Sequence, residues 1–412
     1  MLGHGARVHG AQRRAPGPFP HPGRGARARP RHRAVSVPAR TEVLVVGGGP
    51  VGLAAALQAR RAGREVVVVD RRDGVIDKAC GEGLLPGALA AVLDLGVDPP
   101  GHPLAGISYR DATRHADHPF AAGPGRGVRR TALHAALRDR ALAEGVQIEQ
   151  ATLRGLSQDA RGVDVALDTS HGAAHHDDQD AGGPRTLVRA SWVLGCDGLH
   201  STVRRLTGLD VPARGRARFG LRTHYRTAPW SDLVEVHWTS HAEAYVTPVA
   251  PDVVGVAVLA RRGDTGRRPG GDPPAARTDD DGAPAGLAAF AELADRLRDA
   301  PVLGRVRGAG PLRQRARRRA AGRVRLVGDA SGYVDALTGE GVRVGLAQAD
   351  AVVRHLDDAA TYERAWSRAT RDYRVLTTGL LAWAGSPARG AIVPAASAAP
   401  WLFGAVVERL AR

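Results

Sequence analysis

Three glycines near the start of the patterned part of the chain are spaced so that they could bind a dinucleotide. Gly47, Gly49 and Gly52 form a Gly-x-Gly-x-x-Gly turn between an apolar run at 43–46 and a helical pattern at 53–61. In such a turn the first glycine permits the tight bend, the second lets backbone N–H groups approach a pyrophosphate, and the third allows close helix–strand packing. The helix N-terminus then presents its partial positive charge to the phosphates.

An acidic residue follows at the distance that such a site needs. The apolar run 66–69 ends in Asp70, which lies 18 residues after Gly52, where an acid can accept hydrogen bonds from a ribose diol. A glycine triplet alone is more often an ordinary turn. Here strand, turn, helix, second strand and acid occur in the expected order, and we therefore expect a dinucleotide site. Arg71, next to this acid, is included among the expected cofactor contacts.

The net charge of +16 carries little functional information, because much of it lies in the first forty residues. Residues 1–40 contain nine arginines and no acid, which leaves 49 basic against 42 acidic groups in the rest of the chain. This Arg/Pro/Gly-rich stretch has almost no apolar periodicity and is predicted to be a disordered tail. A non-enzymatic, nucleic-acid-binding protein is an interpretation from charge alone, and we rank it last.

Cysteine content and hydropathy give a cytoplasmic expectation. The chain has two cysteines, no recognisable signal peptide, and no apolar run of the roughly 18 residues that span a membrane. Association with a membrane surface through Trp383 and Trp401 is possible but less favoured than packing of those side chains. His171, His175 and His176 lie in a Gly/Asp-rich stretch that favours a solvated loop, so no metal site is expected.

Two later strand-like runs also end in an aspartate. Asp197 follows the apolar run 192–195, and Asp329 follows the run 324–327. Either acid alone could be a helix cap, which is the commoner role of an isolated aspartate. Between the first strand pair and these motifs, Arg129 and Arg130 open a helical pattern.

Taken in order, these segments resemble the flavoprotein hydroxylase superfamily typified by p-hydroxybenzoate hydroxylase, which includes geranylgeranyl reductases and flavin halogenases. The resemblance rests on three fingerprints: the glycine turn, the Asp-Gly motif at 196–204 and the Gly-Asp motif at 327–330. It spans about residues 41–380 and implies FAD as the cofactor. A halogenase is disfavoured because a Trp-x-Trp-x-Ile-Pro signature is missing.

The resemblance implies a role for each motif. The glycines would cradle the pyrophosphate, Asp70 would bind the adenosine ribose, and Arg130, with Arg129 as its rival, would reach the phosphate or ribose region. Asp197 would approach the pyrophosphate, and Asp329 would hydrogen-bond the ribityl chain. The expected cofactor residues are Gly47, Gly49, Gly52, Asp70, Arg71, Arg130, Asp197, Gly328, Asp329 and Gly341.

The resemblance also places two segments beside the flavin. The loop 338–341 would pass the pyrimidine ring, with the following helix aimed at N1, where its N-terminal charge favours the anionic reduced flavin. Gly339, Glu340 and Gly341 are therefore the candidate catalytic residues, with Cys80 added tentatively, since a free cysteine is as often a small buried side chain. Glu340 and Glu82 are the candidate proton donors.

The expected fold is α/β, with a Rossmann-like FAD-binding domain interleaved with a smaller antiparallel-sheet substrate domain, as in p-hydroxybenzoate hydroxylase. The FAD domain would use 41–76, 125–212 and 305–360. The substrate domain would use 77–124 and 213–304, with a flexible insertion at 261–286. A helical segment, 361–412, would end the chain. Strand-like runs in the substrate domain lie at 217–225, 233–238, 242–247 and 253–259.

Two activities stay open at this point. The segment 80–86, together with 125–130, resembles hydroxylases of aromatic polyketides and favours an NAD(P)H-dependent monooxygenase that acts with O₂ on an aromatic or other hydrophobic small molecule. The loop 335–342 resembles geranylgeranyl reductases, and the Cys-Gly segment 78–86 resembles them too; both favour reduction of isoprenoid double bonds. Because only one nucleotide-binding turn is evident, NAD(P)H would have to dock transiently at the flavin. We favour the hydroxylase narrowly.

Overall fold

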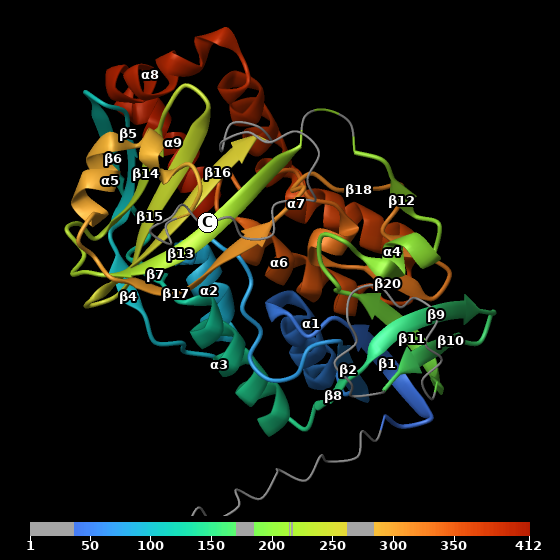
Figure 1. Ribbon diagram of the computed structural model, residues 1–412. Coiled ribbons are helices and arrows are strands. Elements are labelled where there is room, and N and C mark those ends of the chain that lie inside the picture. The colour runs from blue at the N-terminus through green and yellow to red at the C-terminus, as the bar shows by residue number, and fades with distance from the viewer. Residues whose placement is uncertain (1–36, 170–184, 214, 216, 262–283) are drawn as a thin grey trace, which may run out of the picture. The chain divides into compact units, whose positions relative to one another are not determined.

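The structure is a computed structural model that describes residues 37–169, 185–213, 215, 217–261 and 284–412 (Figure 1). Most of the predicted tail 1–40, the histidines at 171, 175 and 176, and most of the insertion predicted at 261–286 lie outside the described residues. The last four tail residues are described: Val37 packs against a core cluster, and the first strand begins at Arg40.

A mainly parallel sheet forms the first half of the fold. Its strands are β1 (Arg40–Val46), β2 (Val66–Asp70), β8 (Gln147–Gln150), β9 (Thr152–Gln158), β10 (Val163–Asp168), β11 (Arg185–Gly195), β19 (Ala320–Ala321) and β20 (Val324–Leu326). The order is β19-β20-β11-β1-β2-β8; β10 pairs antiparallel with β11, and β9 pairs antiparallel with β10. Val46 is in register with Gly195 and with Val69, so the carboxyl ends of β1, β2 and β11 meet at one edge.

Helices cover one face of this sheet and the β9–β10 hairpin covers the other. The helices are α1 (Pro50–Arg61), α3 (Arg130–Ala143), α6 (Gly341–Arg354) and α7 (Ala359–Ala384). Alternation along β1 and β2 divides the core: Val43 and Val45 pack against the helices, and Leu44 and Val46 pack toward the hairpin. Burial on both faces explains why these strands are continuous apolar runs.

A second, largely antiparallel sheet forms the other half, as the sequence predicted. Its order is β17-β13-β16-β15-β14-β5-β6, and only the β14–β5 pairing in it is parallel among the described strands. The strands are β5 (Gly106–Arg110), β6 (His115–Pro119), β13 (Arg218–Arg226), β14 (Leu233–Trp238), β15 (Ala242–Ala250), β16 (Val253–Arg261) and β17 (Val302–Ala309). Four of these occupy the strand-like runs read from the sequence. β17 pairs with β13, so residues 305–309, which we assigned to the FAD domain, lie in this sheet.

Short elements lie outside the two main sheets. They are β3 (Gly83–Leu84), α2 (Pro86–Asp94), β4 (His102–Leu104), β7 (Gly125–Gly127), α4 (Thr202–Leu206), β12 (Asp210–Val211), η1 (Leu287–Ala289), α5 (Ala291–Leu297), β18 (Arg315–Ala316) and η2 (Gly328–Ser331). Three of them form a small sheet of order β3-β7-β4. Alternate residues of β16 face opposite sides: Val256 and Val258 pack with α5, and Leu259 packs with the C-terminal helices.

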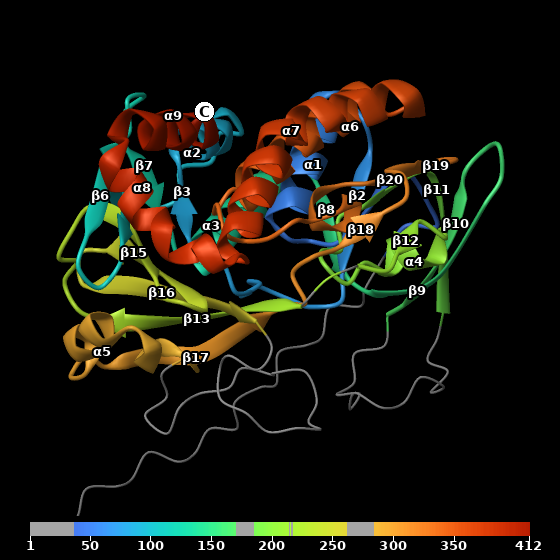
Figure 2. The same ribbon diagram turned by 90° about the horizontal axis from the view of Figure 1, so that it is seen from above.

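The C-terminal segment is helical, as expected, and covers the second sheet (Figure 2). α7 is one continuous helix, and η3 (Pro387–Ala391), α8 (Ile392–Ala398) and α9 (Pro400–Ala411) follow it. Phe403 is buried, whereas Trp401 is 77% exposed. Within the described residues, no single helix is long and apolar enough to cross a membrane; the pair 387–398 and 400–411, bent by 99°, meets those criteria jointly.

Candidate functional site

A cavity of about 840 Å³ lies between the carboxyl edge of the parallel sheet and the antiparallel sheet. Its first end is formed by the glycine turn and the ends of β1, β2 and β11. Its other end is formed by β13, β16, β17 and the loop that precedes α6. The fold therefore brings together, around one cavity, motifs that are up to about three hundred residues apart in the sequence.

The glycine turn has the geometry that its residue types predict. Gly47 has φ of +112°, and a Cβ on it would lie 2.4 Å from the carbonyl oxygen of Cys196. A Cβ on Gly52 would lie 1.8 Å from the carbonyl oxygen of Gly47. Both positions exclude any larger residue. Gly49, by contrast, has nothing within 4 Å of the place a Cβ would occupy, and it lines the cavity.

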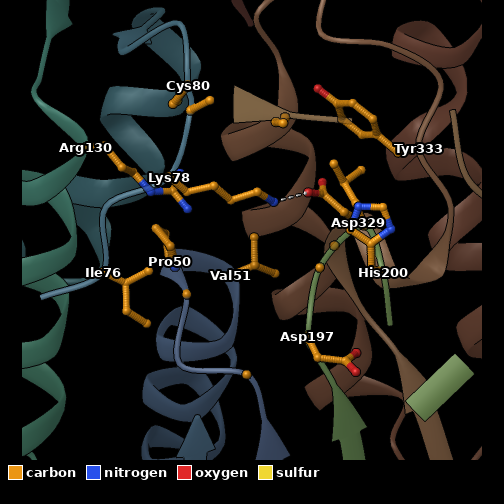
Figure 3. A pocket seen from close by; sticks show the side chains of 18 of the residues that line it. Pro50, Val51, Ile76, Lys78, Cys80, Arg130, Asp197, His200, Asp329 and Tyr333 are labelled. Atoms are coloured by element: carbon orange, nitrogen blue, oxygen red, sulfur yellow. Dashed lines mark hydrogen bonds and ion pairs between the residues drawn. The ribbon is translucent and has the colours of Figure 1, made fainter. Parts of the chain in front are cut away.

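The N-terminus of α1 is open toward the cavity. Gly49 occupies the N-cap position and supplies no side-chain cap, so the first N–H groups of the helix lack the partner that a capping side chain would provide. Pro50 and Val51 line the same wall (Figure 3). A helix start of this kind attracts an anion through its N–H groups and its dipole.

Asp70 lies at the end of β2 with a nearly buried carboxylate. Its oxygens accept hydrogen bonds from the backbone N–H groups of Gly48 and Arg72, each at 2.9 Å. The guanidinium of Arg72 also pairs with it at 3.1 Å. Asp70 and Arg71 both line the cavity. The Asp70 carboxylate is therefore anchored to the glycine turn and still able to accept a hydrogen bond from a ligand at this end.

Arg130, rather than Arg129, lies on the cavity wall among the described residues. The two arginines were alternatives from the sequence, and the start of α3 decides between them because Arg130 is the first helical residue. Its Nε is buried without a hydrogen-bond partner within the described part of the chain. An unsatisfied buried donor of a cationic group indicates room for an anionic partner.

Asp197 has its carboxylate committed to the next helix. It accepts hydrogen bonds from the Ser201 hydroxyl at 2.5 Å and from the N–H groups of Thr202 and Val203 at 2.7 and 3.1 Å. The helix cap that we weighed against a cofactor role is therefore what its side chain forms. Burial raises the pKa of Asp197, and these hydrogen bonds act in the opposite direction. The residue still borders the cavity.

Asp329 faces the only lysine of the chain across the cavity. The Nζ of Lys78 lies 3.3 Å from Oδ2 of Asp329, and both side chains are partly exposed to the cavity (Figure 3). Gly328, with φ of +65°, donates its N–H to Gln348 at 2.7 Å and so fixes the turn that carries this acid. We assigned Lys78 no role from the sequence; its being a single lysine among 57 arginines was the available signal.

The loop before α6 corrects the expectation for Glu340. Gly339 and Gly341 line the cavity, but Glu340 does not. Its carboxylate turns to Arg343, with Oε2 3.0 Å from Nε. Burial raises the pKa of Glu340 to about 7, although Arg343 acts in the opposite direction. Because it faces away from the cavity, Glu340 is not placed to exchange a proton with a ligand there.

Cys80 lines the cavity, whereas Glu82 is buried behind it. Glu82 is therefore also outside the reach of a ligand. Tyr333, which we did not single out from the sequence, lines the cavity beside Gly341. Burial raises the pKa of its hydroxyl well above the ordinary value, so Tyr333 is neutral. No group of three or more metal-ligating side chains occurs in the described residues.

A model of the FAD binding domain family matches residues 40–369. The chain belongs to this family.

Several characterised proteins are similar to this flavoprotein over part of its length. A menaquinone reductase of Mycolicibacterium smegmatis is 57% identical over 58 residues, which cover 14% of each chain. A 3-(3-hydroxy-phenyl)propionate/3-hydroxycinnamic acid hydroxylase of Paraburkholderia xenovorans is 34% identical over 196 residues, covering 43% of this chain and 28% of that protein. The chloroplastic geranylgeranyl diphosphate reductase of Oryza sativa is 29% identical over 323 residues, which cover 74% of this chain and 63% of that protein. The matches thus span under a third of the first two relatives.

Solved structures share the fold. The flavin-dependent halogenase CmlS has a TM-score of 0.67 and 20% identity over 85% of this chain and 65% of its own. The anhydrotetracycline hydroxylase OxyS of Streptomyces rimosus has a TM-score of 0.61 and 21% identity over 90% and 76%. These likenesses support the α/β fold with its interleaved sheets, as the sequence predicted.

The residues present fit FAD. The uncapped start of α1 and the unsatisfied Nε of Arg130 suit a pyrophosphate, and the anchored carboxylate of Asp70 suits a ribose diol. Asp329 lies farther along the same cavity, where a ribityl chain would follow, and Gly339 and Gly341 lie beyond it. FAD is therefore the cofactor of this flavoprotein, and the particular contacts remain predictions.

Proposed function

We propose that this flavoprotein is an FAD-dependent monooxygenase that uses NAD(P)H and O₂ to hydroxylate an aromatic or polyketide-like small molecule. The observation that carries the proposal is the apolar end of the cavity. Leu221, Ala257, Leu259 and Leu312 line it together with Ala336 and the neutral Tyr333. Two arginines at this end, Arg222 and Arg307, are both paired with Asp77. Apolar walls suit a hydrophobic substrate and limit water at the reacting centre.

The chemistry of such a reaction would be divided between the cofactor and the chain. Bound FAD would take hydride from NAD(P)H and activate O₂. The chain's residues would bind and orient: the start of α1 and Arg130 would hold the phosphates, and Gly339 and Gly341 would let backbone N–H groups approach the ring. A helix start at Gly341 places positive potential beside this part of the cavity.

Double-bond reduction of an isoprenoid is the second candidate. It is favoured by the loop 335–342 and by the similarity to a menaquinone reductase and a geranylgeranyl diphosphate reductase. It requires a proton donor near the substrate, and the two acids that we expected to serve, Glu82 and Glu340, both face away from the cavity. Lys78, Cys80, His200 and Tyr333 would be the remaining donors on the wall. This orientation is why we place hydroxylation first.

Oxygen dependence distinguishes the two. The FAD-loaded protein would be incubated with NADPH or NADH and with 3-(3-hydroxyphenyl)propionate, anhydrotetracycline, menaquinone or geranylgeranyl diphosphate in turn. We expect substrate-stimulated O₂ consumption and incorporation of one atom of labelled O₂ into an aromatic or polyketide product. Product that forms anaerobically from chemically reduced protein, without oxygen incorporation, would overturn the proposal in favour of the reductase.

A further inference from the structure

Residues 77–82 form one continuous segment beside the cavity, with a partly exposed acid, Asp77, at its start and a buried acid, Glu82, at its end. Residues 77–81 all line the cavity, and Glu82 follows immediately behind them. Gly81 is held by its carbonyl oxygen, which accepts a hydrogen bond from the Thr247 hydroxyl at 2.8 Å. The two acids, Asp77 and Glu82, are held by the antiparallel sheet.

A continuous hydrogen-bonded chain joins these two acids through β13. The guanidinium of Arg222 donates to Asp77 through Nη2 and to Nδ1 of His224 through Nη1, the latter at 3.3 Å. Nε2 of His224 lies 2.6 Å from Oε2 of Glu82. The other carboxylate oxygen, Oε1, accepts the backbone N–H of Arg130 at 2.8 Å. Arg222, His224 and Glu82 are each no more than 4% exposed.

The residue types fix which group donates and which accepts at each hydrogen bond of this network. An arginine can only donate, so Nδ1 of His224 must accept, and its proton is then on Nε2. A His224 that accepts at Nδ1 and donates from Nε2 to the Glu82 carboxylate matches the donors and acceptors of these hydrogen bonds. The carboxylate is thus used as a double acceptor, for a histidine of the second sheet and for the first residue of α3.

The backbone at Glu82 indicates that this arrangement is held under constraint. Among the described residues, Glu82 is the only non-glycine with a positive φ, at +63°. A non-glycine residue persists in this region only when its surroundings determine it strongly. Its side chain packs so closely on β16 that a Cβ on Gly255 would lie 2.9 Å from Oε2.

We propose that Glu82 and His224 are positioning residues that set the cavity wall at 77–81 and the start of α3, and through them Cys80 and Arg130, for the bound cofactor. The inference rests on FAD occupying the cavity, and it holds for either chemistry proposed above. It replaces the hypothesis that Glu82 donates a proton, because the carboxylate is enclosed by protein donors. Breaking this hydrogen-bonded network should therefore weaken FAD binding beyond its effect on the stability of the fold.

Glu82→Gln is the sharpest test, because an amide cannot satisfy both neighbours. If its oxygen accepts from His224, its NH₂ group meets the N–H of Arg130. If its oxygen accepts from the N–H of Arg130, its NH₂ group must donate to Nε2 of His224. The proton of His224 is then on Nδ1, where it points at the donor of Arg222. One donor–donor contact results in either case. We expect the Kd of FAD, measured by flavin fluorescence on the FAD-free protein, to rise about tenfold or more. The visible absorption bands of the residual bound flavin should also shift.

A matched control exists on another strand of the same sheet. Glu235 on β14 is also buried and also pairs with a histidine, His237, at 3.0 Å, but neither residue lines the cavity. Glu235→Gln should lower the melting temperature of the FAD-free protein about as much as Glu82→Gln, while leaving the Kd of FAD within about twofold. Equal loss of FAD affinity in both variants would overturn the proposal, as would an unchanged Kd and spectrum in Glu82→Gln.

A second variant covers the case in which Glu82→Gln does not fold. His224→Gln keeps a donor toward Glu82 but loses the acceptor for Arg222, so we expect a smaller rise in the Kd of FAD than for Glu82→Gln. No change in this variant would contradict the inference. Wild-type protein that binds no FAD would overturn both the inference and the cofactor assignment. A failure of the hydroxylase proposal would leave these affinities unaffected.

Discussion

At the scale of single residues, the pairing of Lys78 with Asp329 identifies the acid that is most exposed to the cofactor's path. Asp329 has no backbone donor comparable to those that anchor Asp70 and Asp197, and its described partner is the Nζ of Lys78 at 3.3 Å. A ligand hydroxyl entering the cavity could share this carboxylate with the lysine. We therefore expect a contact with Asp329 to contribute more to the affinity for FAD than a contact with either of the other two carboxylates.

Replacement of Asp329 should weaken FAD retention. In Asp329→Ala, the cofactor would lose a charge-assisted hydrogen bond, which contributes about 1.5–3 kcal/mol, and Lys78 would lose its partner. We expect the Kd of FAD to rise roughly tenfold to a hundredfold in a fluorescence titration. Asp350→Ala serves as a control, because Asp350 pairs with Arg354 at 2.9 Å on the exposed side of α6. Equal Kd values in the two variants would contradict this role.

At the scale of elements, the start of α6 combines two glycines that face the cavity with one acid that faces away. Three buried ion pairs tie this loop to the C-terminal segment: Arg389 pairs with Glu243 at 2.7 Å, Glu243 with Arg218, and Arg218 with Asp335 at 3.2 Å. The loop before α6 is thus fixed from the side opposite the cavity. Glu340 belongs to that side, and its effect should be on stability.

Glu340 makes stability depend on pH. A carboxyl whose pKa is raised from 4.5 to about 7 by burial favours the folded protein while it is protonated, so its contribution is present below the lower value and is lost as the pH rises through about 7. Glu340→Gln keeps the neutral form at all pH values. Urea denaturation of the FAD-saturated variant should show that its free energy of unfolding, relative to wild type, improves by a few kcal/mol between about pH 5 and about pH 8. A difference that does not vary with pH would contradict the assignment.

At the scale of the whole molecule, the sequence predicted what depends on local pattern. The glycine turn, four strands of each main sheet and the position of Arg130 at the start of α3 follow from periodicity and motif spacing. The direction of side chains in loops does not follow from spacing. Whether Glu340 or its glycine neighbours face the cavity depends on how α6 docks on α1, and the Lys78–Asp329 contact joins residues 251 positions apart.

The described fold begins at residue 37, slightly before the end of the tail predicted at residues 1–40. Removal of residues 1–36 should leave FAD content and melting temperature unchanged, since that stretch has little apolar pattern with which to pack. Removal of residues 1–40 should lower the melting temperature by a few degrees. It deletes Val37, which packs on the core, and Ala39, whose carbonyl accepts the N–H of Arg189 at 2.9 Å. Comparing the two truncations by thermal melting and flavin absorbance places the boundary. A loss of flavin in the shorter deletion would show that the preceding stretch belongs to the fold.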